Sequence, residues 1–160
     1  ITGYTAKVAG TERGIKEPQA TFSPCFGGPF LTLHPLIYAE LLKKKIKEFN
    51  SKVYLVNTGW IGGSPSSGAK RISISNTRAI ISSILNGSIE RSNFTKEQCF
   101  GLSVPIELDN VRSDILNPEN MWLDKYKYRK VSKHLSLMFR ENFKQYGADV
   151  RYLESYGPQL

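Results

Sequence analysis

A helical pattern followed at once by a short apolar strand pattern constrains the fold of this chain most. His34-Pro35 introduces the helix, because proline is well tolerated in a first helical turn. Apolar residues then recur at helical spacing, at Tyr38, Leu41, Leu42, Ile46 and Phe49. Asn50-Ser51 ends the helix, and residues 53–57 (VYLVN) are β-formers apolar enough to lie inside a sheet. A helix that leads into a buried strand predicts an α/β fold.

The predicted strand runs into a glycine-rich loop over residues 57–63, and open α/β sheets bind ligands in the loops at strand ends. We therefore expect this loop to border a site. The stretch after it has two glycines, Gly63 and Gly68, and a nearby lysine, as a phosphate-binding P-loop does. That motif requires Gly followed directly by Lys and then Ser or Thr, whereas Ala69 intervenes here and Arg71 follows Lys70. The sequence predicts a surface loop instead.

A second strand-to-helix junction follows. Residues 71–75 alternate like a strand edge, and Ser75 or Asn76 can cap a helix over residues 77–85, which Asn86-Gly87 would end.

Arg71, Ile72 and Thr77 flank this junction. A planar guanidinium, an apolar wall and a hydroxyl suit a bound heterocycle. The same residues are equally consistent with an arginine on a sheet edge and a threonine in a first helical turn.

The rest of the sequence, residues 88–160, predicts one more large element. Residues 88–98 and 109–120 are polar and loop-like, and residues 99–106 are typical of an edge strand or an extended segment broken at Pro105. Residues 121–146 form a long helix that Gly147 would end. Its apolar stripe is expected to pack as core, and consists of Tyr128, Val131, Leu135, Met138, Phe139 and Phe143.

Outside the junction at residues 71–77, few side chains indicate a catalytic or ligand-binding role. The acidic residues Asp109, Asp114 and Glu119 lack the spacing of a calcium loop, so no metal site is predicted. His34 is interpreted as structural and His134 as a helix-surface residue. The two cysteines are expected to be free thiols, with Cys25 buried between Pro24 and Phe26, since so low a count without a secretory signal is typical of a reducing compartment.

Composition is that of a soluble globular protein, with 40% hydrophobic and 22% charged residues. No apolar run approaches the roughly 20 residues that span a bilayer, so no membrane partner is expected, and we expect a cytoplasmic protein. The net charge of +8 raises the alternative of a nucleic-acid-binding domain. Many of the basic residues lie at 43–47 and 125–144, among apolar positions, which is typical of solvated helix faces, and no nucleic-acid-binding motif is present.

The N-terminal stretch ITGYTAKVAGTERG, residues 1–14, packs glycines, hydroxyls and opposite charges too densely for a helix or strand interior. From composition alone it is a solvated turn, although Gly3, Gly10 and Gly14 with Lys7 and Arg13 would also suit an anionic ligand. TAKVAGTERGIKEP resembles the mobile lid of the ATP-dependent phosphoenolpyruvate carboxykinases. The resemblance continues through TFSPCFG, LHP, YLVNTGW, KRISISNTRAI and SYGPQL, in the order of that family.

The resemblance implies that residues 1–160 are the C-terminal part of a mononucleotide-binding domain, with a mixed sheet, packed helices and a lid at about residues 5–17. It places Ala9, Gly10, Thr11, Glu12, Arg13 and Gly14 in the lid. It assigns Arg71, Ile72 and Thr77 to the nucleotide pocket. The implied enzyme is a carboxy-lyase, a decarboxylase of gluconeogenesis, that converts oxaloacetate and ATP to phosphoenolpyruvate, carbon dioxide and ADP.

The resemblance also implies what is missing. The family's P-loop, metal ligands and oxaloacetate-binding arginines precede the lid and have no match here, so Mg or Mn would be ligated outside this chain. No catalytic residue is assigned within it. The chain begins at Ile1 without Met, and we expect an N-terminal remainder to precede it and this part alone to be inactive. The alternative is a self-contained basic domain that binds nucleotide or nucleic acid.

Overall fold

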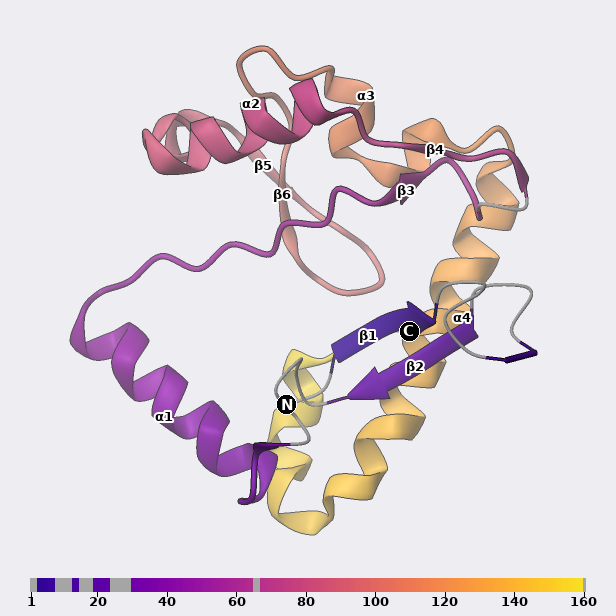
Figure 1. The fold of residues 1–160 in the computed structure, drawn as a ribbon. Coiled ribbons are helices and arrows are strands. Elements are labelled where there is room, and N and C mark those ends of the chain that lie inside the picture. The colour runs from indigo at the N-terminus through magenta and orange to yellow at the C-terminus, as the bar shows by residue number, and fades with distance from the viewer. Residues whose placement is uncertain (1–2, 8–12, 15–18, 24–29, 65–66, 160) are drawn as a thin grey trace. The chain divides into compact units, whose positions relative to one another are not determined.

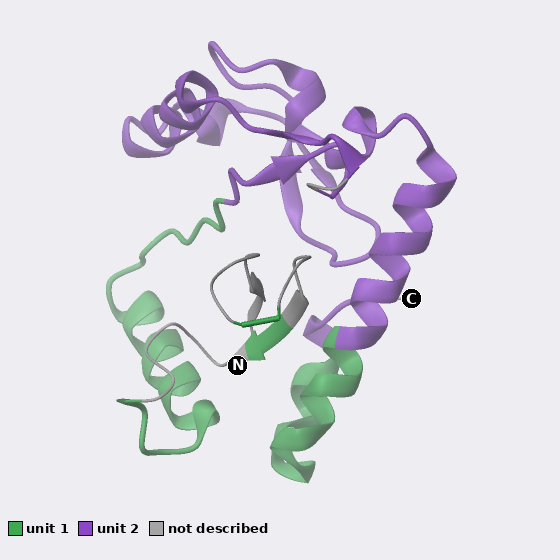
Figure 2. Ribbon diagram, turned by 45° about the vertical axis from the view of Figure 1, so that its right-hand side comes forward, with its two compact units in different colours: residues 1–56, 139–154 green, residues 57–138, 155–160 purple. Residues whose placement is uncertain are grey.

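The computed structural model describes residues 3–7, 13–14, 19–23, 30–64 and 67–159. They belong to two compact units, residues 1–56 with 139–154 and residues 57–138 with 155–160 (Figure 2). Helices and strands both occur, which confirms the predicted α/β class. The described strands form three antiparallel pairs, and no parallel pair occurs among them.

The first unit contains a strand pair and helices (Figure 1). Strand β1 (Gly3–Lys7) pairs antiparallel with β2 (Gln19–Ser23), so that Lys7 lies opposite Gln19. The helices are α1 (Pro35–Glu48), the end of α4 (Lys125–Phe143), the 3-10 helix η5 (Lys144–Tyr146) and most of η6 (Ala148–Tyr156). Val150 is fully buried, and the rings of Phe22 and Phe139 meet edge to face at 5.0 Å.

Helix α1 confirms the helix predicted after His34. The His34 Nδ1 accepts a hydrogen bond from the Leu36 backbone N–H at 3.2 Å, which satisfies one of the free donors of the first turn. The His34 ring also meets the Tyr146 ring edge to face at 6.1 Å. These contacts confirm a structural role for His34. Lys45 and Lys47 lie in the last turn, where positive charge favours the helix dipole.

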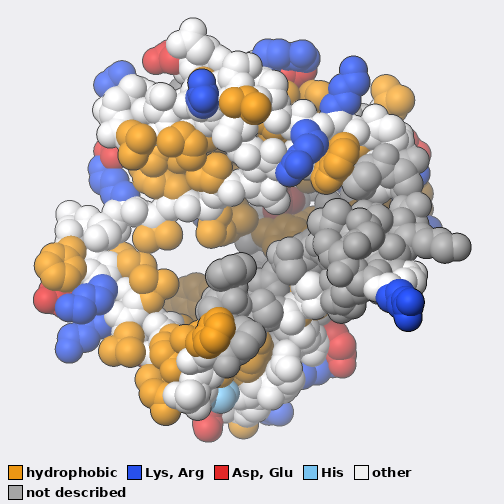
Figure 3. All heavy atoms as spheres, in the orientation of Figure 1, with side chains coloured by type: hydrophobic (Ala, Val, Ile, Leu, Met, Phe, Trp, Pro, Cys, Tyr) orange, Lys and Arg blue, Asp and Glu red, His pale blue; other side chains and the backbone are white. Residues whose placement is uncertain are grey.

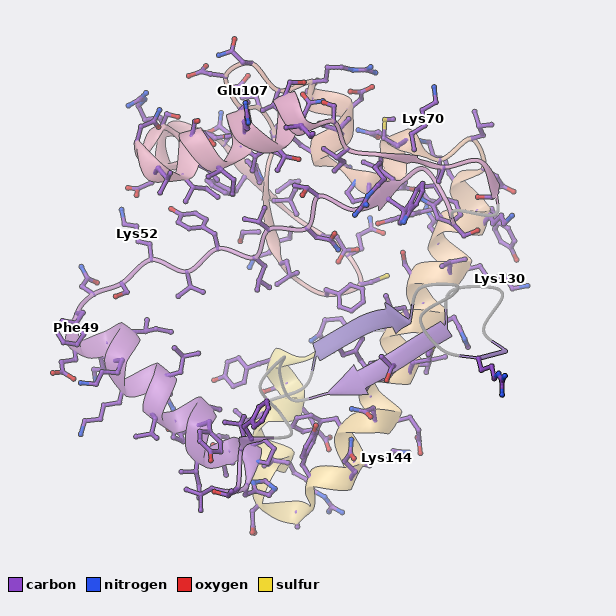
Figure 4. All side chains as sticks on the ribbon, viewed as in Figure 1. Phe49, Lys52, Lys70, Glu107, Lys130 and Lys144 are labelled. Atoms are coloured by element: carbon purple, nitrogen blue, oxygen red, sulfur yellow. The ribbon has the colours of Figure 1, made fainter. Side chains whose placement is uncertain are left out.

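Residues 51–58, which follow α1, are extended but belong to no strand. The strand predicted at residues 53–57 is therefore not formed, and Leu55 is 82% exposed. A strand needs a neighbour to accept and donate its backbone hydrogen bonds, and no described segment supplies one here. Figure 4 labels Phe49 at the end of α1 and Lys52 on this extended segment.

The second unit begins with β3 (Trp60–Ile61) and β4 (Lys70–Arg71), which lead into α2 (Ile74–Leu85). The chain continues through the 3-10 helix η3 (Ser88–Arg91) to the pair β5 (Phe94–Lys96) and β6 (Ser103–Pro105). Helix α3 (Ser113–Leu116) and the 3-10 helix η4 (Pro118–Met121) precede α4. Among the described residues of this unit, the buried apolar side chains are Ile89 and Ile115.

Helix α2 begins earlier than the sequence predicted. The cap is Ser73, rather than Ser75 or Asn76, because the Ser73 hydroxyl oxygen accepts from the Asn76 backbone N–H at 3.2 Å. The strand predicted over residues 71–75 consequently ends at Arg71. The predicted end is confirmed, since Asn86 caps the helix and Gly87 follows with φ of 76°.

Two stretches that were predicted to be loops contain regular structure. Strand β5 lies within residues 88–98, and α3 with η4 lies within residues 109–120. The Glu97 carboxylate accepts from the backbone N–H groups of Cys99 and Phe100, at 2.9 and 2.6 Å, and so shapes the turn between β5 and β6. Side-chain bonds of this kind create turns that propensity alone does not reveal.

Helix α4 confirms the last large element, with shorter bounds than the predicted residues 121–146. Ser136 is fully buried and donates to the Ser132 carbonyl at 3.0 Å, while His134 is exposed as predicted. The Trp122 and Tyr128 rings meet at 5.7 Å near the start of the helix. Among the described helices, none has the length and apolar character needed to cross a membrane.

Gly62→Ala should destabilise the protein more than Gly87→Ala. Both glycines have positive φ, 85° and 76°, so each substitution adds backbone strain of about 1–2 kcal/mol. A Cβ at Gly62 would also lie 2.9 Å from the Met121 carbonyl oxygen, whereas nothing lies within 4 Å at Gly87. Thermal melting of both variants measures the difference, and an equal or smaller loss for Gly62→Ala would contradict the contact.

Candidate functional site

The pair β3–β4 fixes the backbone at Arg71. Trp60 lies opposite Arg71 and Ile61 opposite Lys70 in the antiparallel register. The Ile72 backbone N–H donates to the Gly59 carbonyl at 3.0 Å, which continues the pairing one step beyond the strand. The Arg71 side chain therefore projects from a hydrogen-bonded strand pair rather than from a free loop. Figure 4 labels Lys70, the exposed residue beside it.

The Arg71 side chain is exposed, so its positive charge is accessible to solvent. Its guanidinium carbon lies 5.7 Å from the centroid of the Trp60 ring, within the range of a cation–π contact. No carboxylate among the described residues forms a salt bridge with Arg71. Its N–H donors and charge are thus open to an anionic or hydrogen-bonding ligand.

Thr77 lies in the first turns of α2, where the Ser73 cap fixes it. Its hydroxyl donates to the Ser73 carbonyl at 3.0 Å, and its backbone N–H donates to the same oxygen at 2.9 Å. Because the hydroxyl hydrogen is used in this way, the Thr77 oxygen is left with lone pairs that can accept a hydrogen bond. Thr77 is half-buried, so a ligand can approach it from one side.

Ile72 and Ser73 are the only residues between β4 and α2, so Arg71, Ile72 and Thr77 all lie within one junction. Ile72 is half-buried and offers apolar surface beside the charge of Arg71 and the oxygen of Thr77. The junction thus brings the three predicted residues into one short stretch of defined backbone. Chemically, it offers donors, an acceptor and an apolar wall, which together suit a nitrogen heterocycle.

The predicted lid is described only in part. Ala9, Gly10, Thr11 and Glu12 lie outside the described residues, as does Cys25. Arg13 and Gly14 form an exposed turn, and Gly14 has φ of 90°, a conformation that glycine adopts readily. Strands β1 and β2 lie on either side of this stretch and bring Lys7 opposite Gln19.

Two acidic residues of the second unit, Asp114 and Glu119, form ion pairs with arginines. Asp114 pairs with Arg112, whose guanidinium lowers the pKa of that carboxyl through a hydrogen bond. Glu119 accepts from Arg129 Nε at 2.8 Å. The described residues include no group of three His, Cys, Asp or Glu side chains that could hold a metal ion.

Cys99 is a free, half-buried thiol. Burial, with the nearby Glu97 carboxylate, raises the pKa of the Cys99 thiol above its ordinary value. A raised pKa leaves less thiolate at neutral pH, and the thiolate is the reactive form. The backbone carbonyl of Cys99 accepts from the Gln159 backbone N–H at 2.6 Å, which ties down the C-terminal residues. Cys99 therefore has a structural setting rather than that of a nucleophile.

Comparison with known proteins decides the family. The family model described as phosphoenolpyruvate carboxykinase matches residues 1–114. The chain belongs to the phosphoenolpyruvate carboxykinase family.

Curated relatives with the name phosphoenolpyruvate carboxykinase (ATP) match almost the whole chain. The protein from Caldanaerobacter subterraneus subsp. tengcongensis is 48% identical over 99% of this chain. The proteins from Campylobacter jejuni and Campylobacter lari are 53% and 57% identical over 100% and 91% of it. The chain spans 30%, 31% and 28% of the length of these three carboxykinases, respectively.

Trp60 is the residue at this junction that the sequence reasoning missed. The sequence placed Trp60 in the predicted loop over residues 57–63, with no role of its own. The available signal was weak: an arginine opposite a tryptophan is a favourable cross-strand pair, but residues 62–69 separate the two strands, so the sequence does not show that they pair. A strand over residues 71–75 was predicted, but its partner β3 was not, so the pairing of Trp60 with Arg71 did not follow from the sequence.

Ser73→Ala should lower the stability of the carboxykinase chain, because it removes the cap that fixes the start of α2. Loss of such a cap costs typically about 1 kcal/mol. Ser82→Ala is the matched control, since Ser82 is an exposed position inside the same helix, where alanine is the better helix former. Thermal melting should show a loss for Ser73→Ala alone. Equal midpoints for the two variants would show that the cap contributes nothing.

Proposed function

We propose that this chain is the C-terminal part of the nucleotide-binding domain of an ATP-dependent phosphoenolpyruvate carboxykinase. In this proposal residues 1–160 supply the lid, at about residues 5–17, and the pocket for the adenine base. The complete protein would convert oxaloacetate and ATP to phosphoenolpyruvate, carbon dioxide and ADP in the cytoplasm. The observation that carries the pocket is the single junction that presents Arg71, Ile72 and Thr77.

Each of the three residues has a distinct part in this pocket. Arg71 would direct its free guanidinium donors toward the nucleotide, since no described carboxylate pairs with it. Thr77 would accept from an N–H group of the base, such as the amino group of adenine, because its own hydrogen is committed to the Ser73 carbonyl. Ile72 would pack against the ring. These contacts bind and orient the base end of ATP.

The chemistry itself belongs to the other end of the nucleotide. Loss of carbon dioxide from oxaloacetate leaves its electron pair in an enolate, and transfer of the γ-phosphoryl group from ATP to the enolate oxygen traps it as phosphoenolpyruvate. The lid would close over the site and exclude water, which would otherwise protonate the enolate carbon. In that step, the residues of this chain would position the adenine base and close the site.

Divalent metal ions do not fit the residues described here. Mg and Mn, which the resemblance to the ATP-dependent carboxykinases implies, require clustered oxygen or nitrogen ligands. The described residues offer no group of three suitable side chains, and two of the carboxylates, Asp114 and Glu119, are each paired with an arginine. In the proposal the metal ligands lie in the remainder of the protein, and no step through a metal is derived from this chain.

The pattern of burial supports a dependence on that remainder. Among the described residues only Ile89, Ile115 and Val150 are buried apolar side chains. Large apolar side chains are instead exposed on α1, at its C-cap Phe49 and on residues 51–58, and include Leu41, Leu42, Phe49, Val53, Leu55 and Val56. Figure 3 shows many hydrophobic side chains at the surface of the face it draws. Monomeric soluble proteins rarely expose so much apolar surface, so we propose that the remaining part of the protein covers it.

The proposed pocket can be tested in the complete enzyme by substitution. Arg71→Ala or Thr77→Ala should raise the KM for ATP by about five-fold or more, since a lost hydrogen bond costs on the order of 1 kcal/mol and more where charge is involved. The KM for oxaloacetate should change much less. Arg91→Ala, an exposed arginine in η3, is the matched control and should leave both values unchanged. Wild-type ATP kinetics in both Arg71→Ala and Thr77→Ala would overturn the assignment.

The purified 160-residue chain should not convert oxaloacetate and ATP to phosphoenolpyruvate, because it lacks the groups that hold the phosphates and metals. Co-expression with the part of the Campylobacter jejuni carboxykinase that precedes the matched region should restore turnover. Leu55→Asp should prevent this restoration by placing a charge on the proposed contact surface. Ser51→Asp, which adds the same charge to an exposed polar position of the same segment, should not. Turnover by the purified chain alone would contradict the proposal.

A further inference from the structure

Trp60 and Arg71 form a cross-strand pair at the candidate pocket. Their Cα atoms are partners in the β3–β4 register, and the Arg71 guanidinium carbon lies 5.7 Å from the Trp60 ring centroid. Trp60 is 51% exposed. Opposite residues in an antiparallel pair project from the same face, so the backbone itself places the ring beside the cation. The bond from the Ile72 N–H to the Gly59 carbonyl fixes that register.

An arginine that is to meet a ligand must be held in place without using up its donors. A free arginine side chain has about 2 kcal/mol of rotamer entropy, which binding would have to overcome. A carboxylate partner would hold it, but would also occupy its N–H groups and neutralise its charge. The face of an aromatic ring attracts the cation through its quadrupole and leaves donors available. Among the described residues, the partner of Arg71 is the aromatic ring of Trp60 and not a carboxylate.

We propose that Trp60 is a positioning residue for nucleotide binding, which holds the Arg71 guanidinium ready for the base end of ATP. This inference rests on the proposed pocket. Trp60 acts through Arg71 and does not itself touch the nucleotide. The consequence is a predicted dependence of ATP affinity on the aromatic character of residue 60, with no such dependence for oxaloacetate.

The experiment uses the complete enzyme with four variants, Trp60→Phe, Trp60→Leu, Arg71→Ala and Trp60→Leu/Arg71→Ala. Leucine keeps an apolar side chain and removes the aromatic face, whereas phenylalanine keeps an aromatic face. Trp60→Leu should raise the KM for ATP by about two- to five-fold, the size of an exposed cation–π contact. Trp60→Phe should retain most of the affinity. The KM for oxaloacetate and the melting temperature should stay near those of the parent enzyme.

The double variant separates positioning from direct contact. If Trp60 acts through Arg71, Trp60→Leu adds no further loss in the Arg71→Ala background. A further loss of the same size in that background would mean that the ring touches the nucleotide itself, which overturns the inference. Equal effects on both KM values, with a lowered melting temperature, would show a merely structural role and would also overturn it.

Arg71→Ala distinguishes this inference from the proposed pocket. If Arg71→Ala raises the KM for ATP and Trp60→Leu does not, the pocket stands and the role of Trp60 is overturned. If Arg71→Ala leaves the KM for ATP unchanged, the role of Trp60 is overturned, and the pocket is overturned with it when Thr77→Ala also leaves that KM unchanged. Support requires a loss in each single variant, rescue by phenylalanine and no additional loss in the double variant.

Discussion

The small amount of buried apolar surface limits which parts of this chain can pack together. Folding is driven mainly by removing apolar side chains from water, and the described residues bury only Val150, Ile89 and Ile115. The helices are nevertheless well formed, because their caps and internal hydrogen bonds are local. His34 caps α1 and Ser73 caps α2 through single side-chain acceptors. Local bonds thus define the elements, while large apolar side chains of α1 and of residues 51–58 stay exposed, and we propose that the remainder of the protein covers them.

The same distinction explains what could be predicted from the sequence. The helix after His34, the end of α2 at Asn86-Gly87 and the body of α4 are set by periodicity and capping, which are read within a few residues. The strand over residues 53–57 was predicted from equally clear local signals, but is not formed. Its pairing depends on a neighbour that no described segment provides. Strand β5 was missed for the opposite reason, because its polar residues acquire strand geometry by pairing with β6.

The candidate site could be predicted only in part from the sequence. Residue types at the junction left a ligand pocket and an ordinary strand-to-helix turn equally open, and the resemblance to the ATP-dependent carboxykinases favoured the pocket. The structure adds the hydrogen bond that commits the Thr77 hydroxyl to Ser73 and the ring of Trp60 beside Arg71. Neither could be read from residue types, since each depends on exact backbone geometry. The assignment of these residues to a nucleotide remains a proposal.

The most direct measurement is a crystal structure of the complete protein with bound ATP. We predict that the adenine base lies against Ile72, with Arg71 and Thr77 in contact with it at distances below about 4 Å. We also predict that the triphosphate extends toward residues outside this chain and that residues 53–57 pair with a strand from the remainder. A base bound elsewhere, with Arg71 and Thr77 facing solvent, would contradict the proposed nucleotide pocket.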